Sequence, residues 1–265
     1  MSDEFSALTD DIDDSRAPLM DHLIELRRRL LFSIAALLVT FIGCFAFAEP
    51  IFGFLVHPLL RAGQNRLIYT QLFEAFFVQL KVAFFAGAML AFPVIANQLW
   101  QFVAPGLYRK EKRALLPFLC ATPVLFIAGA AMAYYVAVPA ALHFLLSYQG
   151  DIGGVHQEAL PSVDNYLSFV MQFLFAFGIA FLMPVLLMLL ERAGVVSRKQ
   201  LAGARRYAIV GCFAVALVLA PPDAGSMVLL AVPLIVLYEL ALVAIWFTER
   251  RRARDEVPPT EIVQG

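Results

Sequence analysis

The sequence predicts an all-α integral membrane protein with six transmembrane helices. Of its 265 residues, 61% are hydrophobic and only 15% are charged, which is far from the balance of a soluble globular domain. Apolar stretches near the length needed to cross a bilayer recur along the chain. In chain order, the six expected spans are Leu30–Phe47, Phe76–Phe102, Leu115–Leu146, Leu167–Leu190, Tyr207–Ala220 and Met227–Phe247.

The distribution of positive charge predicts the orientation of these spans. Seventeen of the 20 Lys and Arg residues lie before the first span, after the second, after the fourth and after the sixth. The loops after the third and fifth spans contain none. Because cytoplasmic loops are enriched in Lys and Arg, both termini are expected on the cytoplasmic side of the membrane.

Three regions are expected along the chain. Residues 1–17 are acidic and lack an apolar repeat, so they are expected to form a disordered tail rather than a cleavable signal peptide. Residues 18–250 are expected to form the six-helix membrane domain, and residues 251–265 a cytoplasmic tail. At the start of the domain, the leucines at 19, 23, 26 and 30 share one helical face, which predicts an interfacial helix before the first span.

The sequence also predicts the structure of the loops and the lengths of the last two spans. The 26-residue segment Pro50–Ala75 has an apolar pattern and is expected to hold short helices rather than an open loop. Ser162 or Asp164 is expected to cap the fourth span. Tyr207–Ala220 has only 14 residues, about 21 Å of helix, and the sixth span is similarly short if Glu239 has to reach the interface. The last two spans are therefore predicted to be short.

Motifs of the common enzyme classes are absent from the sequence. It contains no P-loop, GxGxxG, HExxH or GxSxG pattern, and its four histidines lack ligand spacing. Cys44, Cys120 and Cys212 lie in separate apolar spans and are expected to be small buried hydrophobic residues. For Ser226, a turn or cap serine is preferred over an intramembrane protease nucleophile. The sequence therefore predicts no catalytic residue, metal site, cofactor or enzymatic activity.

Ionisable residues at the membrane are the candidates for function, because placing a charge in hydrocarbon is costly. Glu25 and Glu111 lie at the entrances of the first and third spans. Each also has a purely structural interpretation. Glu25 can pair with Arg29 at i+4. Glu111 can form a weak surface salt bridge with one of its neighbours, Arg109, Lys110, Lys112 and Arg113.

Four stretches of the sequence resemble one known family. They are "HLIELRRRL" (22–30), "FPVIANQLWQFVAPGLYRKEKR" (92–113), "YLSFVMQFLFAFGIAF" (166–181) and "APPD" (220–223). They are similar to the signature stretches of TatC, the multi-spanning subunit of the twin-arginine protein translocase. The resemblance covers the chain from about residue 18 to residue 250, and the span order is the same.

The resemblance implies a receptor core that binds twin-arginine signal peptides at the cytoplasmic face. It implies transport of folded proteins across the inner membrane. The family's recognition carboxylates match Glu25 and Glu111, and a family aromatic residue matches Phe102. A carboxylate can meet an arginine fork in a bidentate pair, so the functional interpretation of Glu111 is preferred over the salt bridge. Supporting positions in the matched pattern are Arg27, Pro58, Pro105, Tyr108, Tyr134 and Asp223.

The resemblance also implies partners and an energy source. The partners are TatA- and TatB-like single-span proteins, further copies of the chain and membrane lipids, with no nucleic acid. Without a nucleotide site, the energy is expected to come from the proton motive force.

Two positions depart from the family pattern: Leu182 stands where a glutamate is often found, and Met227 replaces a polar residue. We expect partner docking at these positions to rely on apolar packing.

A second function class stays open at this point, an ion-coupled small-molecule secondary transporter. Lys81, Glu191 and Glu239 would form its polar relay. Such a transporter needs polar residues that converge near the membrane midplane, and the third to fifth spans offer almost none. No internal repeat is visible either. The translocase is therefore the preferred function.

Overall fold

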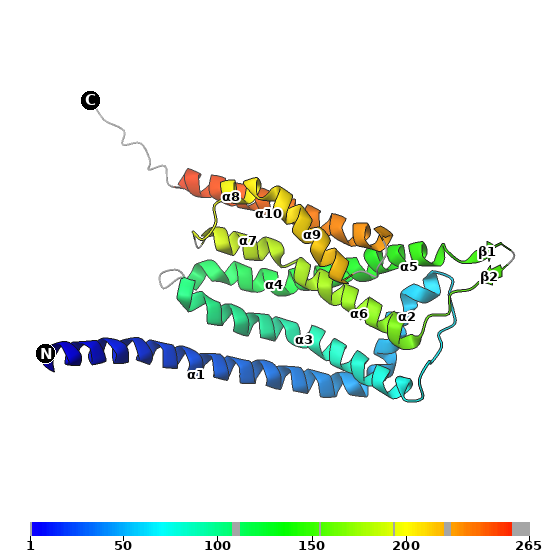
Figure 1. Cartoon of the computed structure of the whole chain (residues 1–265), viewed down its shortest axis with the longest axis horizontal. Helices are drawn as coiled ribbons and strands as arrows, with labels where there is room; N and C mark the ends of the chain where they lie inside the picture. Colours follow the sequence, from blue (N-terminus) through cyan, green and yellow to red (C-terminus); the bar gives the residue numbers. More distant parts are fainter. Residues whose placement is uncertain (1, 108–111, 154, 193, 220–223, 256–265) are drawn as a thin grey trace, which may run out of the picture. The chain divides into compact units, whose positions relative to one another are not determined.

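The computed structural model describes residues 2–107, 112–153, 155–192, 194–219 and 224–255. These residues are helical apart from loops and one short hairpin, which confirms the all-α class (Figure 1). The elements are α1 (Ser2–Ala46), α2 (Ala48–Arg61), α3 (Glu74–Leu107), α4 (Lys112–Met132), a π-helical turn (Ala133–Ala137), α5 (Val138–Leu146), β1 (Gly150–Ile152), β2 (Val155–Gln157), α6 (Val163–Ala180), α7 (Met183–Arg192), α8 (Arg198–Gly203), α9 (Arg205–Leu219) and α10 (Ala224–Asp255).

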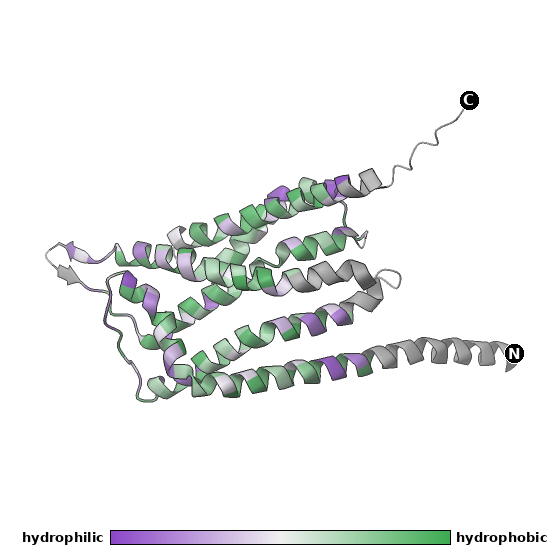
Figure 2. Cartoon of the chain, turned by 180° about the vertical axis from the view of Figure 1, so that it is seen from behind, coloured by the Kyte–Doolittle hydropathy of each residue, from purple (hydrophilic) through white to green (hydrophobic). Residues whose placement is uncertain are grey.

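Within the described residues, five helical stretches are long and apolar enough to cross a membrane. They are Leu23–Ala46, Glu74–Phe102, Ala121–Leu146, Val163–Glu191 and Met227–Arg250. Hydrophobic residues dominate these stretches, and the hydrophilic ones gather toward their ends (Figure 2). The remaining expected span corresponds to α9, which has 15 residues. At 1.5 Å per residue α9 is about 22 Å long, so the count of six spans stays a prediction.

The length of the sixth span stays a prediction. α10 has 32 residues, and its apolar stretch Met227–Arg250 has 24. Within this stretch lies Glu239, the residue on which the expected short span depends. Its Oε2 atom lies 3.0 Å from Nη2 of Arg205 on α9, and pairing with a cation lowers the cost of placing the carboxylate within the helix.

The first helix also begins earlier than the expected boundary. α1 runs without interruption from Ser2, through the acidic segment assigned to a disordered tail and through Pro18. Acidic residues near a helix N-terminus interact favourably with the helix dipole, which gives a physical reason for helix in this segment. The division into a tail, a membrane domain and a C-terminal segment stays a prediction.

The chain divides into two compact units, and the first comprises residues 1–51 and 80–119. In it α1 and α3 lie side by side (Figure 1), and Cys44, Ala48 and Ala83 form a small buried cluster. Thr40 Oγ1 donates a hydrogen bond to the Gly87 carbonyl at 2.9 Å. A Cβ on Gly87 would lie 2.8 Å from Cα of Phe41. The missing side chain at Gly87 thus lets the two backbones approach, as small residues do between membrane helices.

The second unit comprises residues 52–79 and 120–265, and its core is aromatic. Phe126, Phe173 and Phe177 are fully buried there. Gly178 faces the ring of Phe126, where a Cβ would lie 2.6 Å from a ring carbon. α6 ends at Ala180, and α7 begins at Met183, one residue before Pro184. The break therefore falls where a proline cannot continue the backbone hydrogen bonds of a helix.

Buried polar contacts tie the connections of this unit together. Ser162 caps α6 by accepting a hydrogen bond from Asn165 N–H, which confirms one of the two expected caps. Glu74 is buried, with 7% of the residue exposed. It accepts hydrogen bonds from the backbone N–H groups of Thr70, Gln71 and Asp164 and from the Thr70 hydroxyl. One carboxylate therefore joins the start of α3 to the start of α6.

α2 confirms the short helix expected in the segment after the first span, and two tyrosines anchor it. Tyr134 donates to the Phe54 carbonyl at 2.7 Å, and its ring stacks on that of Phe54 with centroids 4.3 Å apart. Tyr166 donates to the Leu55 carbonyl at 2.9 Å. Pro58 is buried in the same helix. A buried tyrosine needs a hydrogen-bond partner, and here the acceptors are carbonyls of α2.

Replacing Gly87 tests the close packing of α1 on α3. Gly87→Ala is expected to lower the free energy of unfolding by roughly 1–3 kcal/mol, because the added Cβ meets the backbone of Phe41. The matched control is Gly43→Ala on α1, where a Cβ meets nothing within 4 Å. That variant should be neutral or slightly more stable, since alanine favours helix over glycine. Thermal unfolding of the purified protein in detergent measures both; equal melting temperatures would contradict the close approach.

Candidate functional site

A chain of polar contacts runs from Glu25 on α1 to Asn97 on α3. Arg29 donates to Glu25 Oε1 from Nε at 3.0 Å and from Nη2 at 2.5 Å. Its Nη1 donates to Gln101 Oε1 at 2.8 Å, and Gln101 Nε2 donates to Asn97 Oδ1 at 3.0 Å. The i+4 pair that the sequence allowed for Glu25 is therefore formed. The same arginine also holds α1 to α3.

The two members of this ion pair differ in accessibility. The side chain of Glu25 is 37% exposed, and that of Arg29 is 19% exposed. Both bonds from Arg29 fall on the same oxygen, Oε1. A carboxylate has about four lone-pair sites on its two oxygens and can accept further donors. Glu25 is thus held in position by its neighbour and still accessible to a second cation.

The structure describes only some of the other predicted binding residues. Phe102 is half-buried on α3, next to Gln101 in the chain. Arg27 is exposed on α1, two residues after Glu25. Pro105 lies in the last turn of α3. Three further predicted residues, Tyr108, Glu111 and Asp223, lie outside the described residues.

The two positions expected to dock partners are both half-buried. Leu182 lies in the break between α6 and α7, where its N–H donates to the Ile179 carbonyl and its own carbonyl accepts from Leu186 N–H. Met227 is in the first turns of α10. The backbone at Leu182 is therefore satisfied locally, and its half-buried apolar side chain fits the apolar packing expected there.

Sequence reasoning missed several polar residues that the structure brings together. Gln101 and Asn97 are spaced i, i+4 on α3, a spacing that could have indicated a shared polar face. Glu74 was also missed, because its partner Asp164 lies 90 residues away in the chain. Of the residues assigned to a transporter relay, Glu239 is paired with Arg205.

The sequence of this chain is similar to those of known proteins. A sequence model of the family described as Sec-independent protein translocase protein (TatC) matches residues 21–233. The chain belongs to the TatC family. A TatC protein of Magnetococcus marinus is 48% identical over 245 residues, covering 92% of this chain and 89% of that protein. The TatC protein of Escherichia coli is 38% identical over 242 residues, covering 90% and 92%.

Solved structures of TatC agree with the fold. A crystal structure described as the twin arginine translocase receptor TatC in DDM has a TM-score of 0.76 and 42% sequence identity. The match covers 84% of this chain and 98% of the other. The resemblance seen in the four sequence stretches is therefore confirmed. This TatC-family chain is a membrane protein of a protein transport system.

The Glu25–Arg29 pair should contribute little to stability. Because both side chains are partly exposed, a double-mutant cycle of Glu25→Gln and Arg29→Gln should give a coupling free energy of about 0.3–0.5 kcal/mol. Unfolding of the four proteins in detergent gives this value. A coupling above about 2 kcal/mol would show that the pair is essential to the fold and not available for binding.

Proposed function

We propose that this TatC-family protein is the receptor core of a twin-arginine translocase. In this function it binds twin-arginine signal peptides at the cytoplasmic face and supports transport of folded proteins across the inner membrane. The observation that carries the proposal is the geometry of Glu25, an accessible carboxylate held through one oxygen by Arg29. Similarity to structures described as twin arginine translocase receptors supports it.

The geometry of Glu25 accounts for recognition of arginine in particular. A guanidinium presents a rigid fork of N–H donors that meets carboxylate oxygens in two parallel bonds, whereas the ammonium of lysine is a point charge. Arg29 is bonded at Oε1, so two N–H groups of a signal-peptide arginine would both bond to Oε2, which has two lone pairs. Gln101 holds Arg29 from the other side. The carboxylate is thereby positioned before the peptide arrives.

Glu111 supplies the second recognition carboxylate in this proposal. It stands in the sequence between two pairs of cations, Arg109 with Lys110 and Lys112 with Arg113. These cations would attract anionic headgroups, and the acid would provide the local attraction for the second arginine of the peptide. Phe102, next to Gln101, would support the apolar part of the peptide. Arg27, Pro105 and Tyr108 would shape the surroundings.

The membrane arrangement is part of the proposal. Six spans, with α9 as the short fifth one, would place both termini in the cytoplasm. The distribution of Lys and Arg supports this orientation. The α1–α3 end with Glu25 would then face the cytoplasm, where signal peptides are presented. Asp223 would lie on the opposite side, before α10.

Partners and energy complete the proposed function. We expect TatA- and TatB-like single-span proteins and further copies of the chain to assemble with it. Leu182 and Met227 would receive a partner helix by van der Waals packing, because both side chains are apolar and half-buried. The sequence holds no nucleotide-binding motif, and the proton motive force would drive transport.

Peptide binding tests the recognition carboxylates. Glu25→Gln and Glu111→Gln should each weaken binding of a twin-arginine peptide by about 1.5 kcal/mol, roughly tenfold, because each loses a charge-assisted bond. A twin-lysine peptide should bind weakly to all forms. Glu49→Gln, an exposed acid on α2, is the control and should bind normally. Isothermal titration in low salt measures this; unchanged binding in both variants would exclude the proposed site.

Cysteine labelling tests the orientation. In a cysteine-free background, a cysteine at Asp151 on β1 should react with a membrane-impermeant maleimide in intact cells. A cysteine at Arg198 on α8 should react only after lysis. The opposite pattern would reverse every cytoplasmic assignment, including that of Glu25.

A further inference from the structure

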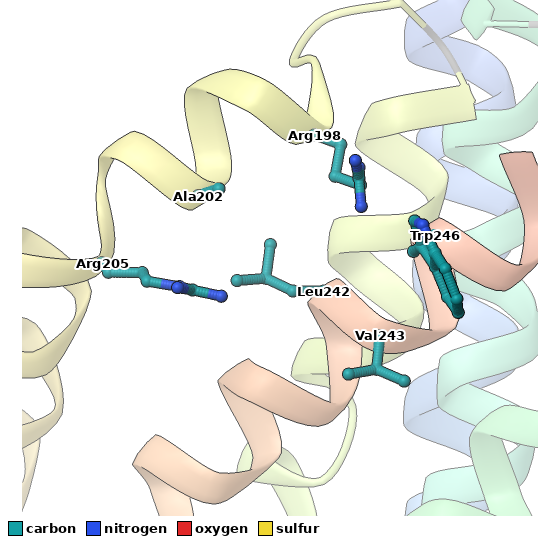
Figure 3. Close-up of a pocket in the computed structure, with 6 residues that line it drawn as sticks. All are labelled: Arg198, Ala202, Arg205, Leu242, Val243 and Trp246. Atoms are coloured by element: carbon teal, nitrogen blue, oxygen red, sulfur yellow. The ribbon is translucent and has the colours of Figure 1, made fainter.

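We infer that the cavity between α8, α9 and α10 binds the headgroup of an anionic phospholipid. This inference does not depend on the proposed receptor function. The cavity has a volume of about 240 Å³, smaller than a typical drug-sized site, and it lies at the end of α10 that carries the basic residues. Its lining residues are Arg198, Ala202, Arg205, Leu242, Val243 and Trp246 (Figure 3).

Two guanidinium groups reach the cavity from different helices. Figure 3 shows Arg198 of α8 and Arg205 of α9 extending toward α10 from either side of Ala202. Each is held by a carboxylate of α10: Nε of Arg198 lies 3.0 Å from Glu249 Oε2, and Nη2 of Arg205 lies 3.0 Å from Glu239 Oε2. The arginine side chains are therefore positioned without a ligand.

These ion pairs leave capacity for an anion. A guanidinium carries five N–H donors, and even a carboxylate that accepts two of them leaves three for another acceptor. On α8, α9 and the described side chains of α10 there are five cations, Arg198, Lys199, Arg205, Arg206 and Arg250, against the two carboxylates. The local charge is therefore positive. A phosphate group matches the fork geometry of arginine.

The apolar part of the cavity fits the region where a headgroup meets its acyl chains. Trp246 forms one wall, and the guanidinium of Arg250 lies 4.0 Å from the centroid of its ring. Tryptophan is enriched at this level of the bilayer, because its ring is apolar and its N–H is polar. Leu242 and Val243 continue the wall along α10.

An exposed apolar stripe runs along α10 through the cavity residue Val243 and reaches the N-terminal half of the helix. Its residues are Val232, Val236, Leu240, Val243 and Phe247, each about half exposed, and they share one helical face. From Val243 to Val232 the stripe is about 16 Å long at 1.5 Å per residue, comparable with an acyl chain. Glu239 borders the stripe, but its charge is paired with Arg205.

The combination of a cationic cavity and an apolar stripe favours a lipid over other anions. Free phosphate would bind at an arginine and would gain nothing from Trp246 or the stripe. A partner helix would use the stripe and leave the arginines without a phosphate. An anionic phospholipid satisfies both parts at once, because its charge and its chains are joined in one molecule.

Lipid binding to the full-length protein tests this inference. Native mass spectrometry from detergent should show phosphatidylglycerol binding at least tenfold tighter than phosphatidylcholine with the same chains. The double variant Arg198→Gln/Arg205→Gln should reduce this preference to less than threefold. Arg206→Gln is the matched control, because Arg206 follows Arg205 in the chain, stacks on Tyr207 and does not line the cavity. It should keep the preference.

A second variant tests the cavity independently, in case the double variant does not fold. Ala202→Phe fills the cavity from an exposed position on α8 and leaves both ion pairs in place, so it should also abolish the preference. Retention of the preference in Ala202→Phe and in the double variant would overturn the inference. Displacement of phosphatidylglycerol by millimolar inorganic phosphate would do the same. So would photo-crosslinking from position 243 to a protein instead of to lipid in native membranes.

Discussion

The constraint on which this fold depends is that hydrocarbon offers no hydrogen-bond partners to the backbone. Long helices satisfy their own N–H and C=O groups, which is why the five long apolar stretches of the described residues are all helical. Polar side chains inside these helices then need partners of their own. Thr40 donates to the Gly87 carbonyl, and Glu239 pairs with Arg205. Charged groups gather instead toward the helix ends, where water and headgroups solvate them (Figure 2).

Association of these helices cannot rely on the hydrophobic effect, because lipid chains are as apolar as the side chains. Close packing has to replace it. Gly87 admits the backbone of α1, and Gly178 admits the ring of Phe126. The π-helical turn at Ala133–Ala137 and the break at Leu182 interrupt otherwise regular helices, and each precedes a proline. Tyr134, in the π-helical turn, bonds to the Phe54 carbonyl of α2. The π-helical turn thus positions the tyrosine that anchors α2.

The proposed receptor site and the proposed lipid site both contain arginine–carboxylate pairs. In the receptor site the carboxylate is the group that binds the ligand, and in the lipid site the arginines are. At Glu25 a cation of the chain positions an acid that remains 37% exposed, so the site attracts cations. At α8 to α10 two acids position arginines whose forks retain donors, so the site attracts anions. In both cases the partner within the chain orients a charged group and does not use all of its bonding capacity. Such sites contribute little to stability and are available for ligands.

The sequence by itself determined the helical class, the approximate positions of the long spans, the helix after the first span, the Ser162 cap and the family, because these follow from local composition and short motifs. It could also indicate that Glu25 and Arg29 lie one helical turn apart. Only the tertiary structure decided which distant residues complete each site. Gln101 lies 72 residues from Arg29, Asp164 lies 90 residues from Glu74, and Arg205 lies on a different helix from Glu239. Glu239 shows why this matters: a carboxylate inside an apolar helix is costly when considered alone, and its cost falls because packing brings Arg205 of α9 to it.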